Sequence, residues 1–237
     1  MRILITNDDG IESAVLPKFI KWAITLGQVT VVAPKFEQSG KSQAIDFRRH
    51  SEVKRVDLGV DCEAYYMDST PADCVQFAVL GLHRQYDIVF SGINRGYNLG
   101  DDISYSGTVG AICEAFRLGM RGIAFSTDFT TFDYALANID NVYNFIVGKK
   151  LFEHTDLINV NFPTEKPKGI CITKQGGMFY SDEFIRLDNG LYMQTGEPVK
   201  YQGDDTSVDI HAIANGYISI TPITAVKTNL SAYEALK

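Results

Sequence analysis

Two adjacent carboxylates, Asp8 and Asp9, follow a short apolar run near the start of the chain and precede a glycine. Two such charges repel each other unless a cation lies beside them. Hard oxygen ligands favour Mg²⁺ or Mn²⁺, with Ca²⁺ as a further option, over zinc. Asp-Asp-Gly is also common turn chemistry, so the pair by itself is compatible with a metal site and with a plain turn.

Two further loops carry small side chains with oxygen atoms. One is Gln38-Ser39-Gly40, and the other is the Gly- and Asn-rich stretch 92–102, which contains Asn94 and Asn98. Each loop follows an apolar run typical of a buried strand. Ligands bind outside the carboxyl ends of the strands in an open parallel sheet, so we expect all three loops to meet at one edge. This convergence favours a metal site over the alternative of three unrelated turns.

A turn of small residues, Tyr105–Ala111, follows the Asn-rich loop and opens a helical pattern. Free N–H groups at the start of a helix, with hydroxyls beside them, form an anion site. The alternative is an ordinary Ser/Thr N-cap, which is the better interpretation of such a motif in isolation. Because the turn comes only a few residues after the Asn-rich loop, we favour a phosphate that binds next to the metal.

The elements that position these loops alternate along the chain between apolar runs and helical patterns. The runs typical of strands are Arg2–Thr6, Val29–Ala33, Tyr86–Ser91, Ile123–Ser126 and Leu157–Asn161. Helical spacing is found over Ser13–Leu26, Thr70–Leu82, Thr108–Leu118 and Phe132–Val147. Continuous apolar strands that alternate with helices predict an α/β fold, with a mostly parallel sheet covered by helices on both faces.

The pattern changes beyond Pro163. The stretch Lys168–Tyr217 is richer in Gly, Tyr and Asp, and its spacing alternates instead of following a helix. We therefore expect a core over residues 1–165 that binds metal and phosphate, and a β-rich extension with a C-terminal segment over residues 166–237. The extension has no helical layer of its own to cover it, so we place it in the subunit interface of a homodimer or a homotetramer.

Composition excludes several other classes of protein. The 237 residues include 22 Lys and Arg against 29 Asp and Glu, a formal net charge of −7, which argues against a nucleic-acid polymer as partner. No apolar run reaches the roughly 18–20 residues that span a membrane, and the N-terminus meets Asp8 too soon for a signal peptide. The four cysteines form no CxxC pair, so we expect reduced thiols and a cytoplasmic protein.

Several motifs, taken together and in this order, are similar to those of one known family. They are Met1–Ile11, Ala33-Pro34 with Gln38–Gly40, Thr70–Val75, Ser91–Asp102, Tyr105–Val109, Asn159–Pro163 and Gly216–Pro222. The chain resembles the SurE family, the survival-protein nucleotidases, over nearly its whole length. The resemblance implies a Rossmann-like core with a β extension that forms dimer contacts. It also implies a metal-dependent phosphatase that hydrolyses nucleoside 5′- and 3′-monophosphates to nucleoside and phosphate.

The resemblance implies two sets of site residues, position by position. The metal ligands would be Asp8, Asp9, Ser39 and Asn94, and the phosphate would be held by Asn98, Ser106, Gly107 and Thr108. Asp8 or Asp9 would be the catalytic residue that positions or deprotonates a water molecule. Direct attack by an aspartate to give an aspartyl-phosphate is the alternative, and both routes stay open.

Two other classes of protein share parts of this pattern. A receiver-type signalling module also binds Mg²⁺ through an acidic pair after its first strand. It needs an Asp at the end of the third strand, however, where this chain has Ser91-Gly92-Ile93-Asn94. A non-catalytic nucleotide sensor would have the same pocket without turnover. We expect an enzyme and keep the receiver and the sensor as alternatives.

Overall fold

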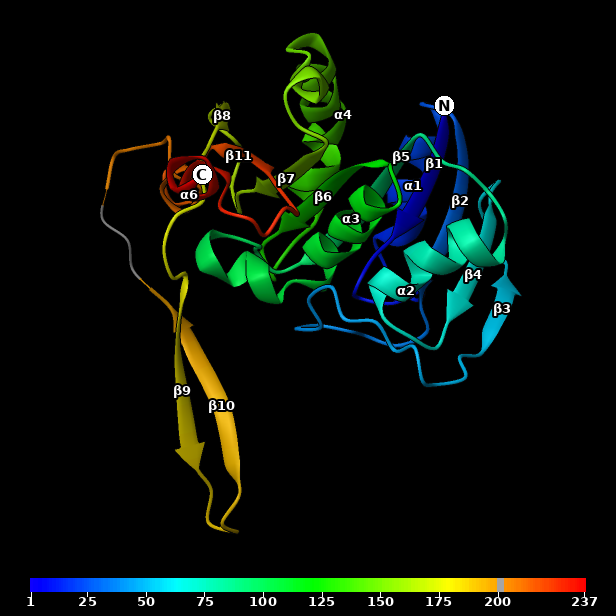
Figure 1. Cartoon of the computed structure of the whole chain (residues 1–237), viewed down its shortest axis with the longest axis horizontal. Helices are drawn as coiled ribbons and strands as arrows, with labels where there is room; N and C mark the ends of the chain where they lie inside the picture. The colour runs from blue at the N-terminus through cyan, green and yellow to red at the C-terminus, as the bar shows by residue number, and fades with distance from the viewer. Residues whose placement is uncertain (200–202) are drawn as a thin grey trace.

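The computed structural model describes residues 1–199 and 203–237, which form a layered body and one projecting hairpin (Figure 1). Within these residues, nine strands form one sheet in the order β3-β4-β2-β1-β5-β6-β7-β11-β8. Its strands are β1 (Arg2–Thr6), β2 (Gln28–Pro34), β3 (Val53–Val56), β4 (Glu63–Met67), β5 (Ile88–Arg95), β6 (Arg121–Thr127), β7 (Leu157–Phe162), β8 (Ile170–Ile172) and β11 (Ile218–Ile223). The hairpin consists of β9 (Tyr180–Arg186) and β10 (Tyr192–Pro198), which pair with each other.

Most of the sheet is parallel. The strands β4, β2, β1, β5, β6 and β7 all run in one direction, and β3 and β11 run antiparallel to their neighbours β4 and β7. The central strands read as continuous apolar runs because both of their faces are buried, and in β1 every residue after Arg2 is buried. The expected mostly parallel α/β sheet is confirmed.

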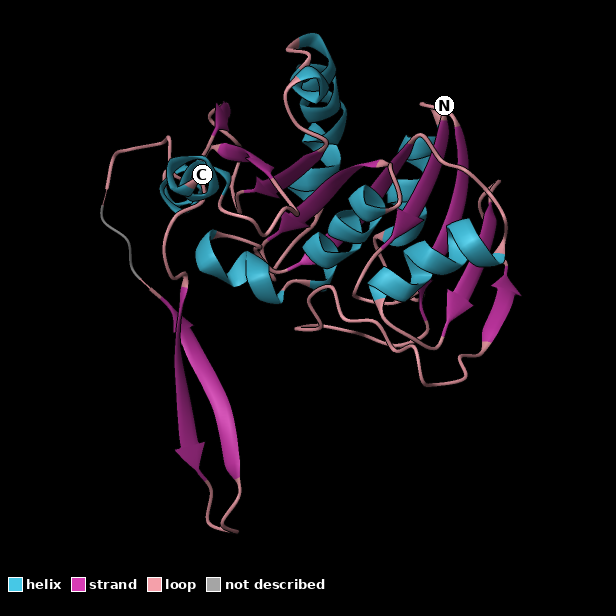
Figure 2. Ribbon diagram, viewed as in Figure 1, coloured by secondary structure: helices cyan, strands magenta, loops and turns pink. Residues whose placement is uncertain are grey.

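Helices cover both faces of this sheet (Figure 2). They are α1 (Leu16–Ile24), α2 (Pro71–Gln76), α3 (Gly107–Arg117), α4 (Asp133–Gly148), α5 (Asp209–Ala214) and α6 (Leu230–Leu236), with shorter turns η1 (Phe77–Gly81), η2 (Gly100–Tyr105) and η3 (Leu151–Glu153). Alternate residues of β1 pack into different clusters. Ile3 and Ile5 join the cluster that contains α1 and α4, whereas Leu4 joins the cluster that contains α2 and α3. Successive strand residues point to opposite faces, so the two helix pairs lie on opposite sides.

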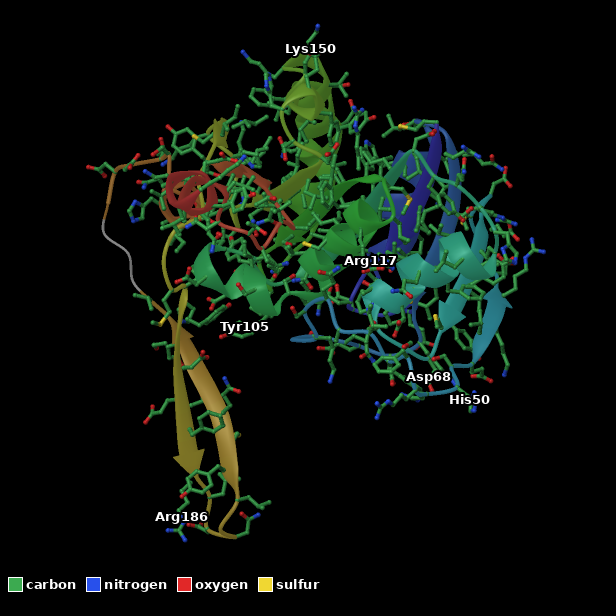
Figure 3. All side chains as sticks on the ribbon, in the orientation of Figure 1. His50, Asp68, Tyr105, Arg117, Lys150 and Arg186 are labelled. Carbon is green, nitrogen blue, oxygen red and sulfur yellow. The ribbon has the colours of Figure 1, made fainter. Side chains whose placement is uncertain are left out.

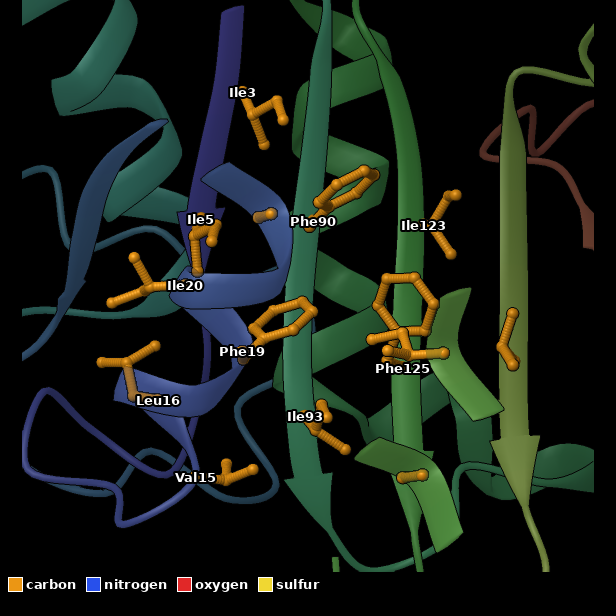
Figure 4. Packing of buried hydrophobic residues seen from close by; sticks show 14 of the residues in the cluster. Ile3, Ile5, Val15, Leu16, Phe19, Ile20, Phe90, Ile93, Ile123 and Phe125 are labelled. Carbon is orange, nitrogen blue, oxygen red and sulfur yellow. The ribbon is translucent and has the colours of Figure 1, made fainter. Parts of the chain in front are cut away.

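Aromatic rings form the centre of the larger cluster (Figure 4). The ring of Phe19 on α1 lies 5.6 Å from that of Phe125 on β6, with the planes at 75°. Phe90 on β5 lies 5.8 Å from the same Phe125 ring, also edge to face. Edge-to-face pairs add to the stabilisation that comes from burying the rings. This packing fixes β5 and β6, the strands whose ends carry much of the candidate site.

The structure shows where two of the expected helices begin and end. Thr70 caps α2, since its hydroxyl accepts a hydrogen bond from the Asp73 N–H (3.1 Å), and Pro71 follows at the first helical position. The helix expected through Leu82 is α2 followed by the π-helical turn η1. The helix expected from Ser13 begins at Leu16, after a turn in which Leu16 N–H bonds the Ser13 carbonyl.

The segment after residue 165 adds strands to the main sheet and also forms the projecting hairpin. β11 lies between β7 and β8, so the chain's last strand extends the main sheet. The hairpin β9–β10 projects away from the body and accounts for the expected β-rich extension (Figure 1). The helix α5 lies within the stretch that we expected to be rich in strands, and its six residues are too few to show a helical period. The division of the chain at residue 165 stays a prediction.

Candidate active site

The three oxygen-rich loops follow β1, β2 and β5, which are adjacent and parallel. Hydrogen bonds link the loops directly. Gln38 N–H donates to the Asp8 carbonyl at 2.7 Å, and Arg95 N–H donates to Asp9 Oδ2 at 3.2 Å. The structure therefore brings the Asp8-Asp9 pair, the Ser39 loop and the end of β5 together at the carboxyl edge of the sheet.

Asp8 is buried against the start of α3, with 3 % of its surface exposed. Its Oδ1 accepts a hydrogen bond from the Thr108 hydroxyl at 2.5 Å, and its Oδ2 accepts one from the Thr108 N–H at 3.2 Å. Burial raises the pKa of Asp8 from 3.8 to about 6, although the Thr108 hydroxyl lowers it, and the negative charge of Asp9 adds to the rise. A carboxylate from the first loop thus occupies the N-terminus of the helix that we expected to bind phosphate.

Asp9 points to the other side of the same loop. It is half-buried, and burial raises the pKa of its carboxyl above the usual 3.8 even though Arg95 N–H bonds to it. The negative charge of Glu37 raises this pKa further. A cavity of about 460 Å³ opens beside Asp9, and Ser39 and Arg95 also line it. Asp9 is therefore the member of the pair that faces open space.

Ser39 and Asn94 both keep an oxygen atom for a further partner. The Ser39 hydroxyl donates its hydrogen to Glu37 Oε1 at 2.7 Å, so the lone pairs of its oxygen remain for a cation. Asn94 is buried at the end of β5, where the pairing with β6 shifts register. Its Nδ2 donates to the Gly96 carbonyl at 2.8 Å, so its Oδ1 is the atom left to act as a ligand.

Asn98 is buried and is held by side chains from two other strands. Its Nδ2 donates to the Ser126 hydroxyl at 2.7 Å, and its N–H donates to Asn161 Oδ1 at 2.9 Å. The carbonyl of Asn98 accepts hydrogen bonds from Asn159 (2.8 Å) and Asn161 (2.9 Å) on β7. These two β7 residues belong to the motif Asn159–Pro163 but are not among the predicted site residues. The signal was available, because Asn-Val-Asn interrupts an otherwise apolar strand.

Ser106 and Gly107 define the start of α3. The Ser106 hydroxyl accepts a hydrogen bond from Val109 N–H at 3.0 Å, so Ser106 is the N-cap. A Cβ at Gly107 would lie 3.0 Å from the Asp8 Cβ and 3.3 Å from the Gln38 carbonyl oxygen. Glycine is thus needed for the close approach of the first two loops to α3. The N-cap interpretation of the turn holds for Ser106, while Thr108 contacts the candidate site through Asp8.

The donor set of Asp8, Asp9, Ser39 and Asn94 fits a hard divalent cation. Two carboxylates, a hydroxyl and an amide oxygen are the ligands that Mg²⁺, Mn²⁺ and Ca²⁺ take. Burial raises the pKa of both acids, so their charged forms are disfavoured in the fold, and a cation beside them would favour those charged forms. The part of the chain that the structure describes contains no cluster of three or more His, Cys, Asp or Glu for a metal. The candidate site therefore depends on two neutral oxygen ligands as well as two acids.

An open, mostly parallel sheet with a polar site at its carboxyl edge defines a Rossmann-like α/β protein. The family profile described as "Survival protein SurE" matches residues 3–182. The chain belongs to the SurE family.

Individual relatives match over the full length of the chain. "5′-nucleotidase SurE 1" of Thermus thermophilus is 38 % identical, with 100 % of this chain and 96 % of the relative covered. "5′-nucleotidase SurE" of Clostridium botulinum is 35 % identical and covered to 98 %. Among solved structures, the SurE protein from Aquifex aeolicus superimposes with a TM-score of 0.81 at 33 % identity, with 100 % and 98 % of the two chains covered.

Proposed function

We propose that this protein is a metal-dependent phosphatase that hydrolyses nucleoside 5′-monophosphates, and also 3′-monophosphates, to nucleoside and phosphate. The observation that carries the proposal is a pair of adjacent acids of raised pKa, one of which, Asp8, bonds the N-terminus of α3. Such a site has negative ligands for a cation next to N–H and hydroxyl donors for an anion. The names of the full-length relatives, 5′-nucleotidase SurE, support the substrate class.

The site residues fall into two groups, one that would bind the cation and one that would bind the phosphate. Asp8, Asp9, Ser39 and Asn94 would hold a divalent cation, which supplies positive charge that polarises a phosphate oxygen. The Thr108 N–H and hydroxyl, which Asp8 holds here, are donors that a phosphate needs. Donors fixed in advance at a helix N-terminus stabilise the charge on the phosphoryl group with little reorganisation.

Asp9 is better placed than Asp8 to accept a proton from water. It lines the cavity, whereas both carboxylate oxygens of Asp8 bond to Thr108. A raised pKa makes Asp9 a stronger base than an exposed aspartate. We therefore assign the positioning or deprotonation of water to Asp9. The aspartyl-phosphate route would instead need an aspartate free to attack phosphorus, which again favours Asp9 over Asp8.

Hydrolysis assays with and without chelator test the proposal. The substrates would be p-nitrophenyl phosphate and the 5′- and 3′-monophosphates of adenosine, guanosine and uridine. We expect turnover that EDTA abolishes and that Mg²⁺, Mn²⁺ or Ca²⁺ restores. Tight nucleotide binding without turnover would favour the sensor, and activity that survives exhaustive chelation would exclude the metal. The receiver alternative has no support, because the end of β5, Ser91-Gly92-Ile93-Asn94-Arg95, contains no acid.

We also propose that the hairpin forms contacts between the subunits of a homodimer or homotetramer. Its strands expose large apolar side chains, with Phe184 65 % and Tyr192 62 % exposed, and it extends away from the body as far as Arg186 (Figure 3). Long strands with exposed apolar residues are covered in stable proteins.

A cytoplasmic location is the last part of the proposal. Its support is that all four cysteines are free, as expected of a protein in a reducing compartment. Separately, none of the helices in the described residues is long and apolar enough to cross a membrane.

A further inference from the structure

The cavity beside Asp9 is lined on one side by residues that have no role in the proposed reaction. Besides Asp9, Ser39 and Glu37, it is lined by Arg95, Phe129 and Phe132. Both aromatic residues come from the segment between β6 and α4. At about 460 Å³, the cavity is within the range of roughly 300–1,000 Å³ found for small-molecule sites. One continuous cavity therefore connects a candidate catalytic carboxylate to two aromatic rings.

Phe129 is exposed and yet held in place. It is 59 % exposed, although a ring of this size is normally buried. The ring lies over Gly96, where a Cβ would be 2.8 Å from Phe129 Cζ. Gly96 also has a φ of +133°, and its N–H bonds to the Thr127 carbonyl at 2.8 Å. The loop after β5 thus supports the ring from beneath.

The rest of this wall is tied to the carboxylate loop. The Arg95 guanidinium lies 5.2 Å from the centre of the Phe132 ring, within the range of a cation–π contact. The N–H of the same Arg95 donates to Asp9 Oδ2 at 3.2 Å. The position of the aromatic wall is therefore coupled to that of Asp9 through a single residue.

We propose that this cavity is the nucleobase subsite, in which the base stacks on the exposed ring of Phe129 while the phosphate lies at the Asp8-Asp9 loop. The assignment rests on the proposed function and specifies its substrate class. Stacking on an aromatic ring accepts any base, because every base has a π-face. We therefore expect the enzyme to prefer nucleotides over simple phosphomonoesters but to discriminate weakly among the four bases.

A second cavity near the site has a different character. It measures about 580 Å³ and is lined by residues of η2 and of the hairpin, with rings from Tyr105 and Tyr180. Gly40, Asp102 and Tyr105 reach it from the candidate site loops, and Asp182 adds a second carboxylate. Since neither Asp9 nor Ser39 lines this cavity, it is the poorer place for the base of a bound substrate, and Tyr180, which lies outside the candidate site loops, makes a matched control.

The test compares substrates with and without a base. Wild type, Phe129→Ala, Phe129→Trp and Tyr180→Ala would be assayed with adenosine 5′-monophosphate and with ribose 5-phosphate. Loss of base–aromatic stacking should raise the KM of Phe129→Ala for the nucleotide by between about 5-fold and 150-fold. Its KM for ribose 5-phosphate should change less than about 2-fold, since that substrate has no base to stack. Phe129→Trp should restore the KM for the nucleotide, and Tyr180→Ala should behave as wild type.

Three results would overturn the subsite. They are a nucleotide KM that Phe129→Ala leaves unchanged, a rise in KM in Phe129→Ala that is equal for both substrates, and a nucleotide-selective rise in KM in Tyr180→Ala instead. If wild type hydrolyses neither substrate, the proposed function fails on its own. Calorimetric titration with adenosine 5′-monophosphate and with adenosine then decides the subsite. Binding that Phe129→Ala weakens selectively would support it, and absence of binding to wild type would overturn it.

Discussion

The Thr108 side chain donates a hydrogen bond to Asp8 across 100 positions of sequence, at 2.5 Å, and the Thr108 N–H donates a second at 3.2 Å. The first loop of the sheet is thereby attached to the N-terminus of α3. The favourable interaction of an anion with a helix N-terminus stabilises this attachment. A phosphate bound at this turn would use the same two donors. It would therefore compete with the Asp8 carboxylate, which stabilises the free protein through them.

Removal of the Thr108 hydroxyl should therefore destabilise the free protein. We expect Thr108→Ala to lower the free energy of unfolding by about 1.5–3 kcal/mol, the usual contribution of a hydrogen bond to a charged group. Thr108→Ser keeps the hydroxyl and should stay near wild type. Urea denaturation of both variants at neutral pH measures the difference. Equal stability of Thr108→Ala and Thr108→Ser would contradict the role given to this hydrogen bond.

The stability of the metal-free protein should depend on pH through Asp8. Its pKa in the folded protein is about 6, above the 3.8 of an unperturbed aspartate, so folding favours the protonated form. This contribution is complete below about pH 4 and is lost as the pH rises through 6, a change on the order of 3 kcal/mol. Urea denaturation in EDTA at pH 4.5 and pH 7.5 should show it. Asp8→Asn has no carboxyl group at this position, so its free energy of unfolding should lack this pH-dependent change. Equal pH dependence of the unfolding free energy in the variant and in wild type would refute the assignment to Asp8.

Neutralising Asp9 should remove activity without unfolding the protein. We expect Asp9→Asn to lower phosphatase turnover by about 100-fold or more, the scale seen when one charge-stabilising group is lost. Its melting temperature should not fall, because burial raises the pKa of this carboxyl and the charge is unfavourable in the fold. Asp188→Asn, on the exposed hairpin turn, is the control. Full activity in Asp9→Asn would remove this residue from the mechanism.

A side chain at Gly107 should disturb the whole phosphate end of the site. A Cβ there would lie 3.2 Å from Asp8 Oδ2 as well as close to the loop after β2. We expect Gly107→Val to abolish binding of inorganic phosphate in a calorimetric titration and to weaken Mn²⁺ binding, since Asp8 must move. Gly148→Val is a suitable control, because a Cβ at Gly148 meets no atom within 4 Å. Normal phosphate affinity in Gly107→Val would show that the anion binds elsewhere.

One face of the hairpin should control assembly. Phe184 pairs with Gln194 and Arg186 pairs with Tyr192, so Phe184 and Tyr192 share a face of the two-stranded sheet. We expect the double variant Phe184→Ser with Tyr192→Ser to be monomeric by light scattering at micromolar concentration. Glu183→Ser lies on the opposite face and should keep the wild-type mass. A wild-type protein that is itself monomeric would remove the proposed interface.

The sequence was most informative where local chemistry and fold agree. The apolar run of β1 predicts both a buried strand and the place of Asp8 and Asp9, because a parallel strand must deliver its loop to the carboxyl edge. The strands β3 and β4 gave no such signal. β3 is the edge strand and β4 lies next to it, and both are largely half-exposed, so they lack a continuous apolar run.

Contacts within the site were harder to predict than its location. The turn 105–111 is visible in the sequence, but the bond from Thr108 to Asp8 depends on the angle at which α3 meets the sheet. The aromatic wall depends in the same way on how the segment after β6 passes over Gly96. Spacing along the chain carries no information about either approach, because both are set by tertiary packing.

The place of β11 between β7 and β8 has a consequence for how the protein is made. While the chain is being synthesised, β7 has its partner β6 on one side and an open edge on the other until residues 218–223 emerge. Unpaired strand edges of this kind promote association between incomplete chains. Asn159 and Asn161 face Thr221 and Ser219 across that edge, and they also hold the Asn98 loop. The support for the Asn98 loop of the candidate site is therefore completed only after β11 has emerged, late in the synthesis of the chain.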